Sequence, residues 1–123
     1  KESLNKIQHD LFDIGGELSI PNHIAISEDK ILFLEESIDK INKTLQSLKE
    51  FILPGGTKES AYCHLARTVC RRTERVLFKL SKIEKINPAS LKYINRLSDY
   101  LFVLARFLNK FNKIEDILWK KSI

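Results

Sequence analysis

The chain has 123 residues, of which 43% are hydrophobic and 30% charged, and its formal net charge is +5. This length allows one domain with a hydrophobic core, and the composition excludes a disordered chain. No apolar run is long enough to span a membrane, and the interleaved acidic and basic residues permit nucleic-acid binding without indicating it.

Four helical segments are expected, divided by the three prolines. Leucine and isoleucine far outnumber valine, which favours helix over sheet. The first helix is expected over about residues 3–18, where apolar residues recur at helical spacing. Gly15-Gly16 interrupts this pattern, so we expect either close backbone packing or an early helix end there.

The second helix is expected to begin after Ser27, a good N-cap. It carries the clearest amphipathic stripe in the chain, with steps of three and four residues: Ile31, Leu34, Ile38, Ile41, Leu45 and Leu48. Thr57 is expected to cap a third helix that extends to about Ile83.

Asn87 followed by Pro88 predicts the start of the fourth helix, because asparagine is a good N-cap and proline suits the first helical position. This helix extends to about Leu108 and is apolar on two sides, which is typical of a helix between two partners. The fold class is therefore all-α: an antiparallel helical bundle that forms one domain over residues 1–123.

The third expected helix carries a row of charged residues: Arg67, Arg71, Arg72, Glu74 and Arg75. Steps of three and four place several of them on one helix face with His64. Neighbouring guanidinium groups repel one another unless an anion neutralises them, and arginine binds phosphates and carboxylates through paired donors. Apolar residues on the other sides predict a largely buried helix, in which an arginine needs a partner. An anion site is indicated; a solvated charged face is the alternative.

No catalytic triad, P-loop, dinucleotide fingerprint or zinc-protease motif is present. Cys63, His64 and Cys70 lack zinc-type spacing, so no metal site is expected and the thiols are interpreted as structural. Asn95 and Asp99 on the fourth helix are candidates to orient the arginines, with ordinary polar contacts between helices as the alternative.

Three sequence blocks, in this order and spacing, resemble the PduO-type ATP:cob(I)alamin adenosyltransferases: FILPGG at 51–56, HLARTVCRRTER at 64–75 and NRLSDYLF at 95–102. The stretch IQHDLFDIGGELS at 7–19 is similar to the family's second helix. The resemblance implies a five-helix bundle assembled as a homotrimer, with the active site between subunits. The free thiols of Cys63 and Cys70 fit a cytoplasmic location. The enzyme would move the 5′-deoxyadenosyl group of ATP onto the cobalt of cob(I)alamin and release triphosphate, with Mg²⁺ assisting.

The resemblance also implies residue roles. Arg71 and Arg67 would be the catalytic arginines: Arg71 would bind the ATP phosphates, and Arg67 would pair with an acid of the neighbouring subunit. Asn95 would be a second nucleotide contact, and Phe51 would press under the corrin ring. The remaining assignments are ATP-site positions at Glu74 and Arg75 and supporting ion pairs at Arg72 and Asp99.

The sequence departs from the family pattern at one place. Members of the family carry a Thr- and Gly-rich nucleotide-binding segment and a further helix before the first matched helix, and this sequence contains neither. Because the sequence begins with Lys1 rather than methionine, we expect the encoded protein to contain them. Two other hypotheses remain open. One is a non-catalytic module whose arginine helix binds a phosphate-bearing partner such as nucleic acid; the other is a structural trimerisation bundle.

Overall fold

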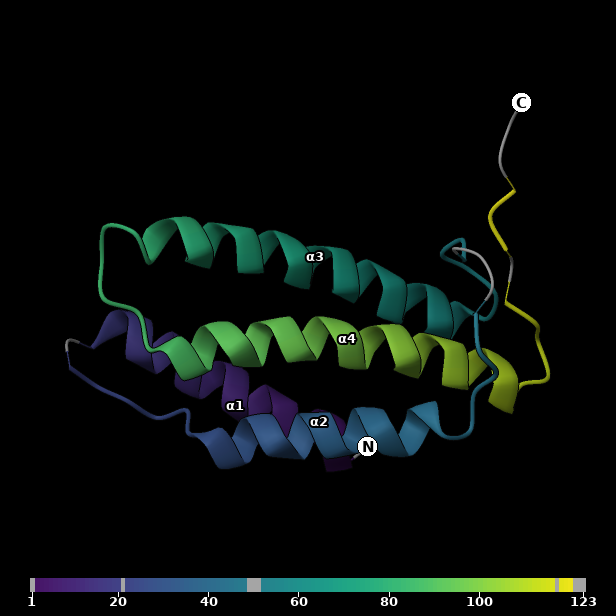
Figure 1. Cartoon of the computed structure of the whole chain (residues 1–123), viewed down its shortest axis with the longest axis horizontal. Coiled ribbons are helices and arrows are strands. Elements are labelled where there is room, and N and C mark those ends of the chain that lie inside the picture. Colours follow the sequence, from purple (N-terminus) through teal and green to yellow (C-terminus); the bar gives the residue numbers. More distant parts are fainter. Residues whose placement is uncertain (1, 21, 49–51, 117, 121–123) are drawn as a thin grey trace.

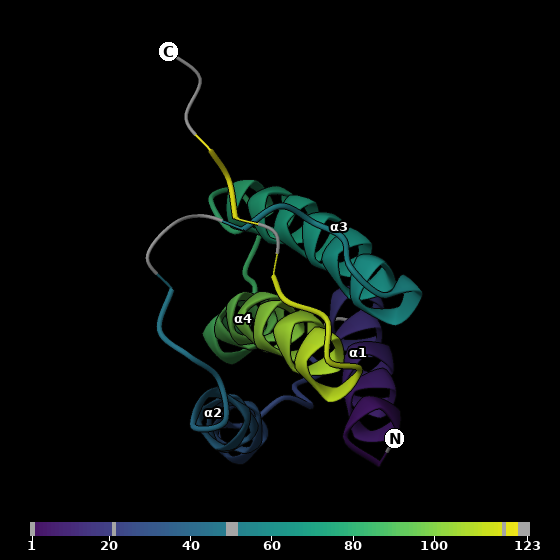
Figure 2. The same ribbon diagram turned by 90° about the vertical axis from the view of Figure 1, so that its right-hand side faces the viewer.

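The computed structural model describes residues 2–20, 22–48, 52–116 and 118–120. These ranges contain α1 (Glu2–Ser19), α2 (Glu28–Asn42), α3 (Lys58–Leu80) and α4 (Pro88–Phe111), and no strand. Successive helices run in opposite directions (Figure 1), as expected of an antiparallel bundle. Seen end-on, α4 lies between the other three helices (Figure 2). The predicted all-α class and the four helices are confirmed.

Two of the three predicted N-caps are confirmed in full. The Thr57 hydroxyl accepts a hydrogen bond from the amide of Ser60 at 3.0 Å. The Asn87 side chain accepts from the amide of Ala89 at 3.1 Å, and Pro88 occupies the first turn of α4. Ser27 stands at the N-cap position of α2, but its hydroxyl bonds to Asp29 instead of to the helix amides.

Local turn geometry corrects two boundaries. The stripe through Leu45 and Leu48 predicted a longer α2, but the helix ends at Asn42. There the amide of Thr44 bonds to the carbonyl of Ile41 at 2.9 Å, a tighter pattern than the α-helix makes. In α1 the helix passes through Gly15-Gly16 to Ser19, so the early end was wrong. The prediction of close backbone packing was also wrong at Gly15, because a Cβ at that position would have no atom within 4 Å.

The core is built around α4, which packs against α2 and α3. Tyr93 is fully buried, and its hydroxyl donates to the buried Asp10 of α1 at 2.9 Å. Ile31 and Leu34 of α2 are also fully buried. The prediction that α4 lies between partners is confirmed, and α4 therefore holds its side chains in fixed positions.

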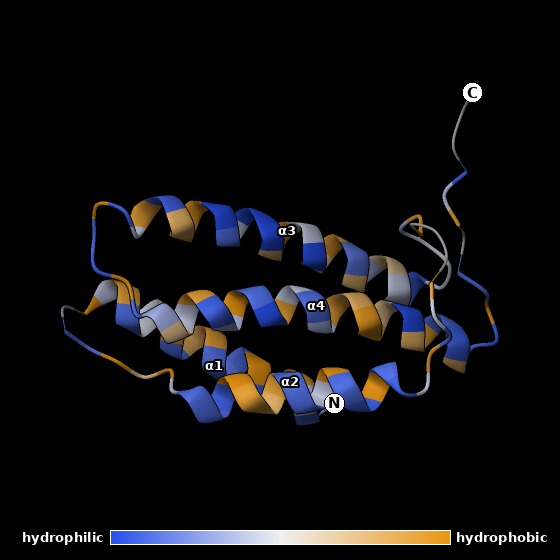
Figure 3. Cartoon of the chain, viewed as in Figure 1, coloured by the Kyte–Doolittle hydropathy of each residue, from blue (hydrophilic) through white to orange (hydrophobic). Residues whose placement is uncertain are grey.

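The expectation that α3 is largely buried was wrong for the single chain. Only Ser60, His64, Cys70 and Leu77 of this helix are buried. Its other apolar side chains remain open, with exposed fractions of 60% for Leu65 and 58% for Val76. Figure 3 shows that hydrophobic and hydrophilic segments alternate along α3. An apolar stripe in a sequence predicts a buried face, but the covering partner need not belong to the same chain.

No helix in the described ranges is both long and apolar enough to cross a membrane.

Candidate functional site

Three of the predicted ATP-site residues meet where α3 faces α4. Glu74 lies at the centre of this cluster, and one carboxylate oxygen accepts a hydrogen bond from the Asn95 amide nitrogen at 2.8 Å. The other oxygen lies 3.5 Å from a terminal nitrogen of Arg71, one turn earlier on α3. The side chain of Arg71 is 54% exposed, so most of its donors face solvent. The cluster therefore offers a positioned cation at the surface, as a phosphate site requires.

Sequence reasoning missed two members of the same network. The Asn95 carbonyl oxygen accepts from a terminal nitrogen of Arg96 at 2.5 Å. Arg96 in turn donates through Nε to Glu35 of α2 at 2.9 Å. Arg96 could have been found from the sequence, because it directly follows Asn95 in the block at 95–102. Nothing in the sequence connects Glu35 to it, because the pairing depends on how α2 packs against α4.

Arg67, one turn before Arg71 on α3, lies over the ring of Phe102, with 5.3 Å from its guanidinium carbon to the ring centroid. Its Nε is buried and has no hydrogen-bond partner within the described residues. A cation–π contact with Phe102 holds the guanidinium in place but leaves its polar edge available.

His64 is 2% exposed and packs edge-on against Phe102, with 6.4 Å between ring centroids. Both of its ring nitrogens lack partners within the described residues. Burial, followed by the nearby positive charge of Arg67, lowers the pKa of His64, and Asp116 opposes this only in part. His64 is therefore neutral at pH 7, and it does not share the solvent-facing position of Arg71.

The other predicted site residues stand apart. Arg72, Arg75 and Asp99 are exposed, and none of them forms an ion pair with another described residue. Their roles stay predictions. Phe51, the predicted corrin contact, lies outside the described residues.

The thiols fit the structural interpretation. Cys70 is buried, and its sulfur donates to the carbonyl of Ile94 at 3.3 Å. Burial raises the pKa of Cys70 to about 11, so it is not a reactive thiolate at neutral pH. The described residues contain no cluster of three acidic, histidine or cysteine side chains suited to a metal ion.

The turn at Gly55-Gly56 before α3 is held by Asn109 of α4, a residue that the sequence analysis did not single out. Its amide nitrogen donates to the carbonyl of Gly55 at 3.1 Å, and its oxygen accepts from the amide of Thr57 at 2.8 Å. Gly56 has φ 96°, and a Cβ there would collide with the Asn109 carboxamide. Glycine is therefore required, and α3 starts at a fixed point.

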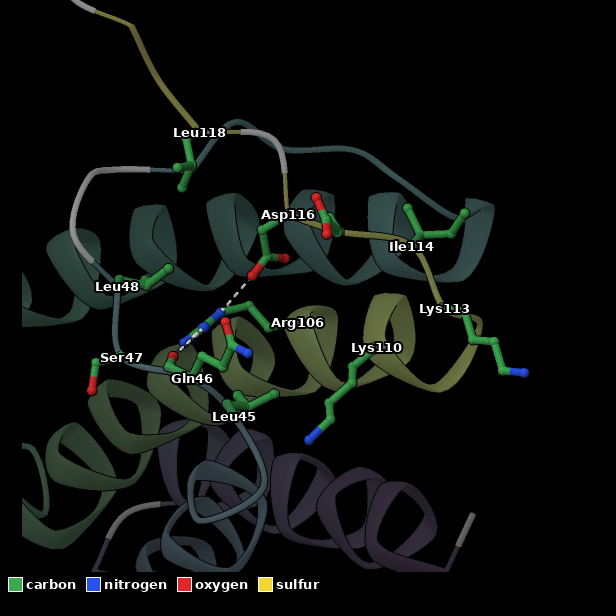
Figure 4. Close-up of a pocket in the computed structure, with 11 residues that line it drawn as sticks. Leu45, Gln46, Ser47, Leu48, Arg106, Lys110, Lys113, Ile114, Asp116 and Leu118 are labelled. Carbon is green, nitrogen blue, oxygen red and sulfur yellow. Dashed lines mark hydrogen bonds and ion pairs between the residues drawn. The ribbon is translucent and has the colours of Figure 1, made fainter.

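A cavity of about 540 Å³ opens between the segment after α2, the end of α4 and the residues that follow it (Figure 4). Arg106 lies at its base and donates to Asp116 at 2.9 Å and to the carbonyl of Gln46 at 2.6 Å. A second cavity of about 530 Å³ shares Arg106 and includes Phe102. Leu48 and Ile52, which flank residues 49–51 in the sequence, lie at this end of the bundle. Both cavities lie at the same end of the molecule and are lined by charged, polar and apolar side chains.

The chain matches the sequence model of one family, described as cobalamin adenosyltransferase, over residues 1–108. It is 48% identical over 122 residues to a cobalamin adenosyltransferase of Cupriavidus metallidurans, covering 99% of this chain and 66% of that protein. It is 44% identical over 119 residues to a corrinoid adenosyltransferase of Bacillus subtilis, covering 94% and 62%. The chain thus spans less than two thirds of the length of these relatives.

Solved structures agree with the sequence relatives. One is a variant of the PduO-type ATP:corrinoid adenosyltransferase from Lactobacillus reuteri complexed with cobalamin and ATP. Its TM-score is 0.92 at 39% identity, and the match covers 99% of this chain and 69% of that one. A second variant of the same enzyme, complexed with ATP, gives a TM-score of 0.89 at 38% identity, with 97% and 70% covered.

Proposed function

Because this chain belongs to the cobalamin adenosyltransferase family, we propose that the protein transfers the 5′-deoxyadenosyl group of ATP to the cobalt of cob(I)alamin and releases triphosphate. The observation that carries this proposal is the hydrogen-bonded cluster of Arg71, Glu74 and Asn95. Three residues from two helices, each expected at a nucleotide site, come together there at the protein surface.

The proposed reaction is a nucleophilic displacement. Cobalt(I) gives an electron pair to C5′ of ATP, and a cobalt–carbon bond forms. The bond between C5′ and its oxygen breaks, and its electron pair leaves with triphosphate, so cobalt is oxidised to cobalt(III). No proton has to be removed, so this reaction needs no general base. The protein has to align the substrates and stabilise the charge that develops on triphosphate.

In this proposal Arg71 binds the phosphates, with Glu74 orienting its guanidinium group, and Asn95 gives a second nucleotide contact. Arg75 would join the ATP site when the nucleotide is bound. Phe51 would press under the corrin ring.

Mg²⁺ would enter with the nucleotide. The described residues hold no metal-ligand cluster, so they do not fit a magnesium cage made by the protein alone. This agrees with the usual behaviour of Mg²⁺, which keeps several waters and binds through substrate phosphates and one or two carboxylates. Glu74 is the carboxylate that pairs with Arg71, the proposed phosphate ligand.

We also propose that the protein is a homotrimer. The exposed stripe on α3 comprises Tyr62, Leu65, Val69 and Val76, which are 47–60% exposed in the single chain. Apolar stripes of this kind usually mark contacts between proteins. Arg67, on the same helix, carries a buried nitrogen with no partner in the described ranges, which supports an acid supplied by a neighbouring subunit. Arg72 and Asp99 would add ion pairs at that interface.

We propose a cytoplasmic location, since free Cys63 and Cys70 fit a reducing compartment.

The experiment that tests the activity is an anaerobic optical assay of the complete encoded protein with ATP and chemically reduced cobalamin. We expect the absorption of the cobalt–carbon product to appear only when ATP is present. A flat trace from folded, full-length protein would refute the proposed activity. The hypothesis of a non-catalytic anion-binding module would then take its place.

A further inference from the structure

The orientation of the Asn95 carboxamide is fixed on both sides. Its nitrogen faces the Glu74 carboxylate, which accepts one N–H at 2.8 Å. Its oxygen faces the Arg96 guanidinium, which donates to it at 2.5 Å. Turning the carboxamide over would place its oxygen against a carboxylate and its nitrogen against a guanidinium group. Both contacts would be repulsive, so only one orientation is stable.

This orientation leaves one particular group for a ligand. Asn95 has two N–H donors, and within the described residues only one of them is used. Its oxygen is already engaged by Arg96. Asn95 can therefore donate to a ligand but has little capacity left to accept from one. The matching ligand atom is an acceptor, such as a phosphate or ribose oxygen or a ring nitrogen of adenine.

Arg96 is itself held in place from another helix. Its Nε donates to Glu35 of α2 at 2.9 Å, and the side chains of Arg96 and Glu35 are only 29% and 39% exposed. With Nε engaged, a terminal nitrogen is directed to Asn95. Glu35 therefore acts on Arg96 directly, and Arg96 acts on Glu74 and Arg71 only through Asn95.

We propose that Arg96, held by Glu35, is a positioning residue for the nucleotide: it fixes Asn95 as a hydrogen-bond donor and keeps Glu74 available to orient Arg71. Without Arg96, the carboxamide can rotate and release Glu74. The free carboxylate then competes with phosphate for the Arg71 guanidinium group. This inference rests on the proposed function, since it concerns how the same site binds ATP.

The test compares Arg96→Met with a matched control in the complete encoded protein. Arg96→Met keeps the apolar stem of the side chain and removes every donor. The control is Lys92→Met, one turn earlier on α4, where Lys92 pairs with Glu28 of α2 at 3.8 Å. Both pairs join the same two helices, but Lys92 has no contact with the nucleotide cluster. KM and kcat are measured for ATP, and the Kd for ATP is measured by calorimetry.

Arg96→Met removes a charge-assisted hydrogen bond that positions the Asn95 donor for ATP. It should therefore raise KM and Kd for ATP about tenfold. We expect kcat to change less than about twofold in Arg96→Met, because the reacting atoms are not contacted. Lys92→Met should leave both constants within about twofold of the wild type. Glu35→Gln, which does not contact Asn95, should raise KM by a smaller factor.

A double-mutant cycle separates positioning from a structural role. If Arg96 acts through Asn95, then Arg96→Met should add less than about twofold to the KM of Asn95→Ala. Full additivity would overturn the inference. So would a lower melting temperature in Arg96→Met with an unchanged Kd for ATP, because that is what a purely structural ion pair predicts. If Arg96→Met does not fold, Glu35→Gln and Arg96→Lys provide the same comparison.

These measurements distinguish a failure of this inference from a failure of the proposed function. An active wild type with unchanged constants in Arg96→Met and Glu35→Gln refutes the role of Arg96 alone. A wild type that binds ATP without forming product refutes the activity, and the calorimetric constants still decide the role of Arg96. A wild type that does not bind ATP refutes both.

Discussion

Glu17, near the end of α1, should be one of the most sensitive single positions in the fold. Its carboxylate accepts hydrogen bonds from the amides of Ala25 and Ile26 at 2.6 and 2.7 Å. It also accepts from the side chains of Asn87 at 3.0 Å and of Ser90. One side chain thus joins α1, the loop before α2 and the N-terminus of α4. Glu17→Ala would leave all these donors without their acceptor.

The free energy of unfolding that Glu17→Ala would lose follows from these contacts. Because the carboxylate is only partly buried, each lost bond is assigned about 0.5–1 kcal/mol, toward the low end of the usual range. Four bonds then give about 2–4 kcal/mol. Since domains are stable by only about 5–15 kcal/mol, this is a large share of the free energy of unfolding. It should lower Tm by roughly 10 °C.

The assay is urea unfolding followed by circular dichroism, with thermal unfolding as a second measure. Glu36→Ala on α2 is the matched control, because Glu36 is exposed and has no ion pair among the described residues. We expect it to stay within about 0.5 kcal/mol of the wild type. Glu17→Gln, which keeps one acceptor oxygen, should fall between the two. A Glu17→Ala protein as stable as the control would refute this account of the junction.

Four further outcomes are expected. Burial alone would raise the pKa of Glu17, but the hydrogen bonds from Ser90, Ile26, Ala25 and Asn87 outweigh it and lower the pKa. The stability from Glu17 is therefore fully present above its ordinary pKa of about 4.5 and lost as pH falls through the lowered value, so acid unfolding curves should be shallower in Glu17→Gln. Arg71→Ala should lose at least about 100-fold in ATP-dependent turnover, with Tm nearly unchanged since its exposed ion pair with Glu74 contributes less than about 1 kcal/mol; unchanged turnover would contradict its assignment. Phe51→Ala should spare the reaction from cobalt(I) far more than the reaction from cobalt(II), and equal losses in the optical assay would count against a role under the corrin ring. Leu65→Asp should dissociate the proposed trimer in sedimentation velocity, whereas an unaltered sedimentation coefficient would exclude the α3 stripe from the interface.

Local chemistry made much of the fold predictable. Thr57 and the Asn87-Pro88 pair specify helix starts through bonds to residues two or three positions away, so the sequence alone locates them. Helix ends were less predictable. The apolar Leu45 continues the α2 stripe in sequence, yet the chain turns at Asn42 and Leu45 instead lines a cavity.

The candidate functional site could also be predicted only in part. Spacing along α3 predicted that Arg71 and Glu74 are neighbours, and the sequence blocks supplied the family and its expected roles. The spacing did not reveal that His64 is buried while Arg71 faces solvent, nor that α3 leaves an apolar stripe uncovered. Periodicity shows which sides of a helix are apolar, but not what packs on them.

By itself, then, the sequence determined that four helices form, the caps at Thr57 and Asn87 and the row of arginines, because these depend on bonds and spacings within a few residues. Tertiary structure alone decided the partners of Asn95: Glu74 from α3 on one side, and Arg96 held by Glu35 of α2 on the other. Residues 61 positions apart become neighbours only when α2 and α4 pack together. Such a pairing follows from the burial of whole helix faces, and no local pattern encodes it.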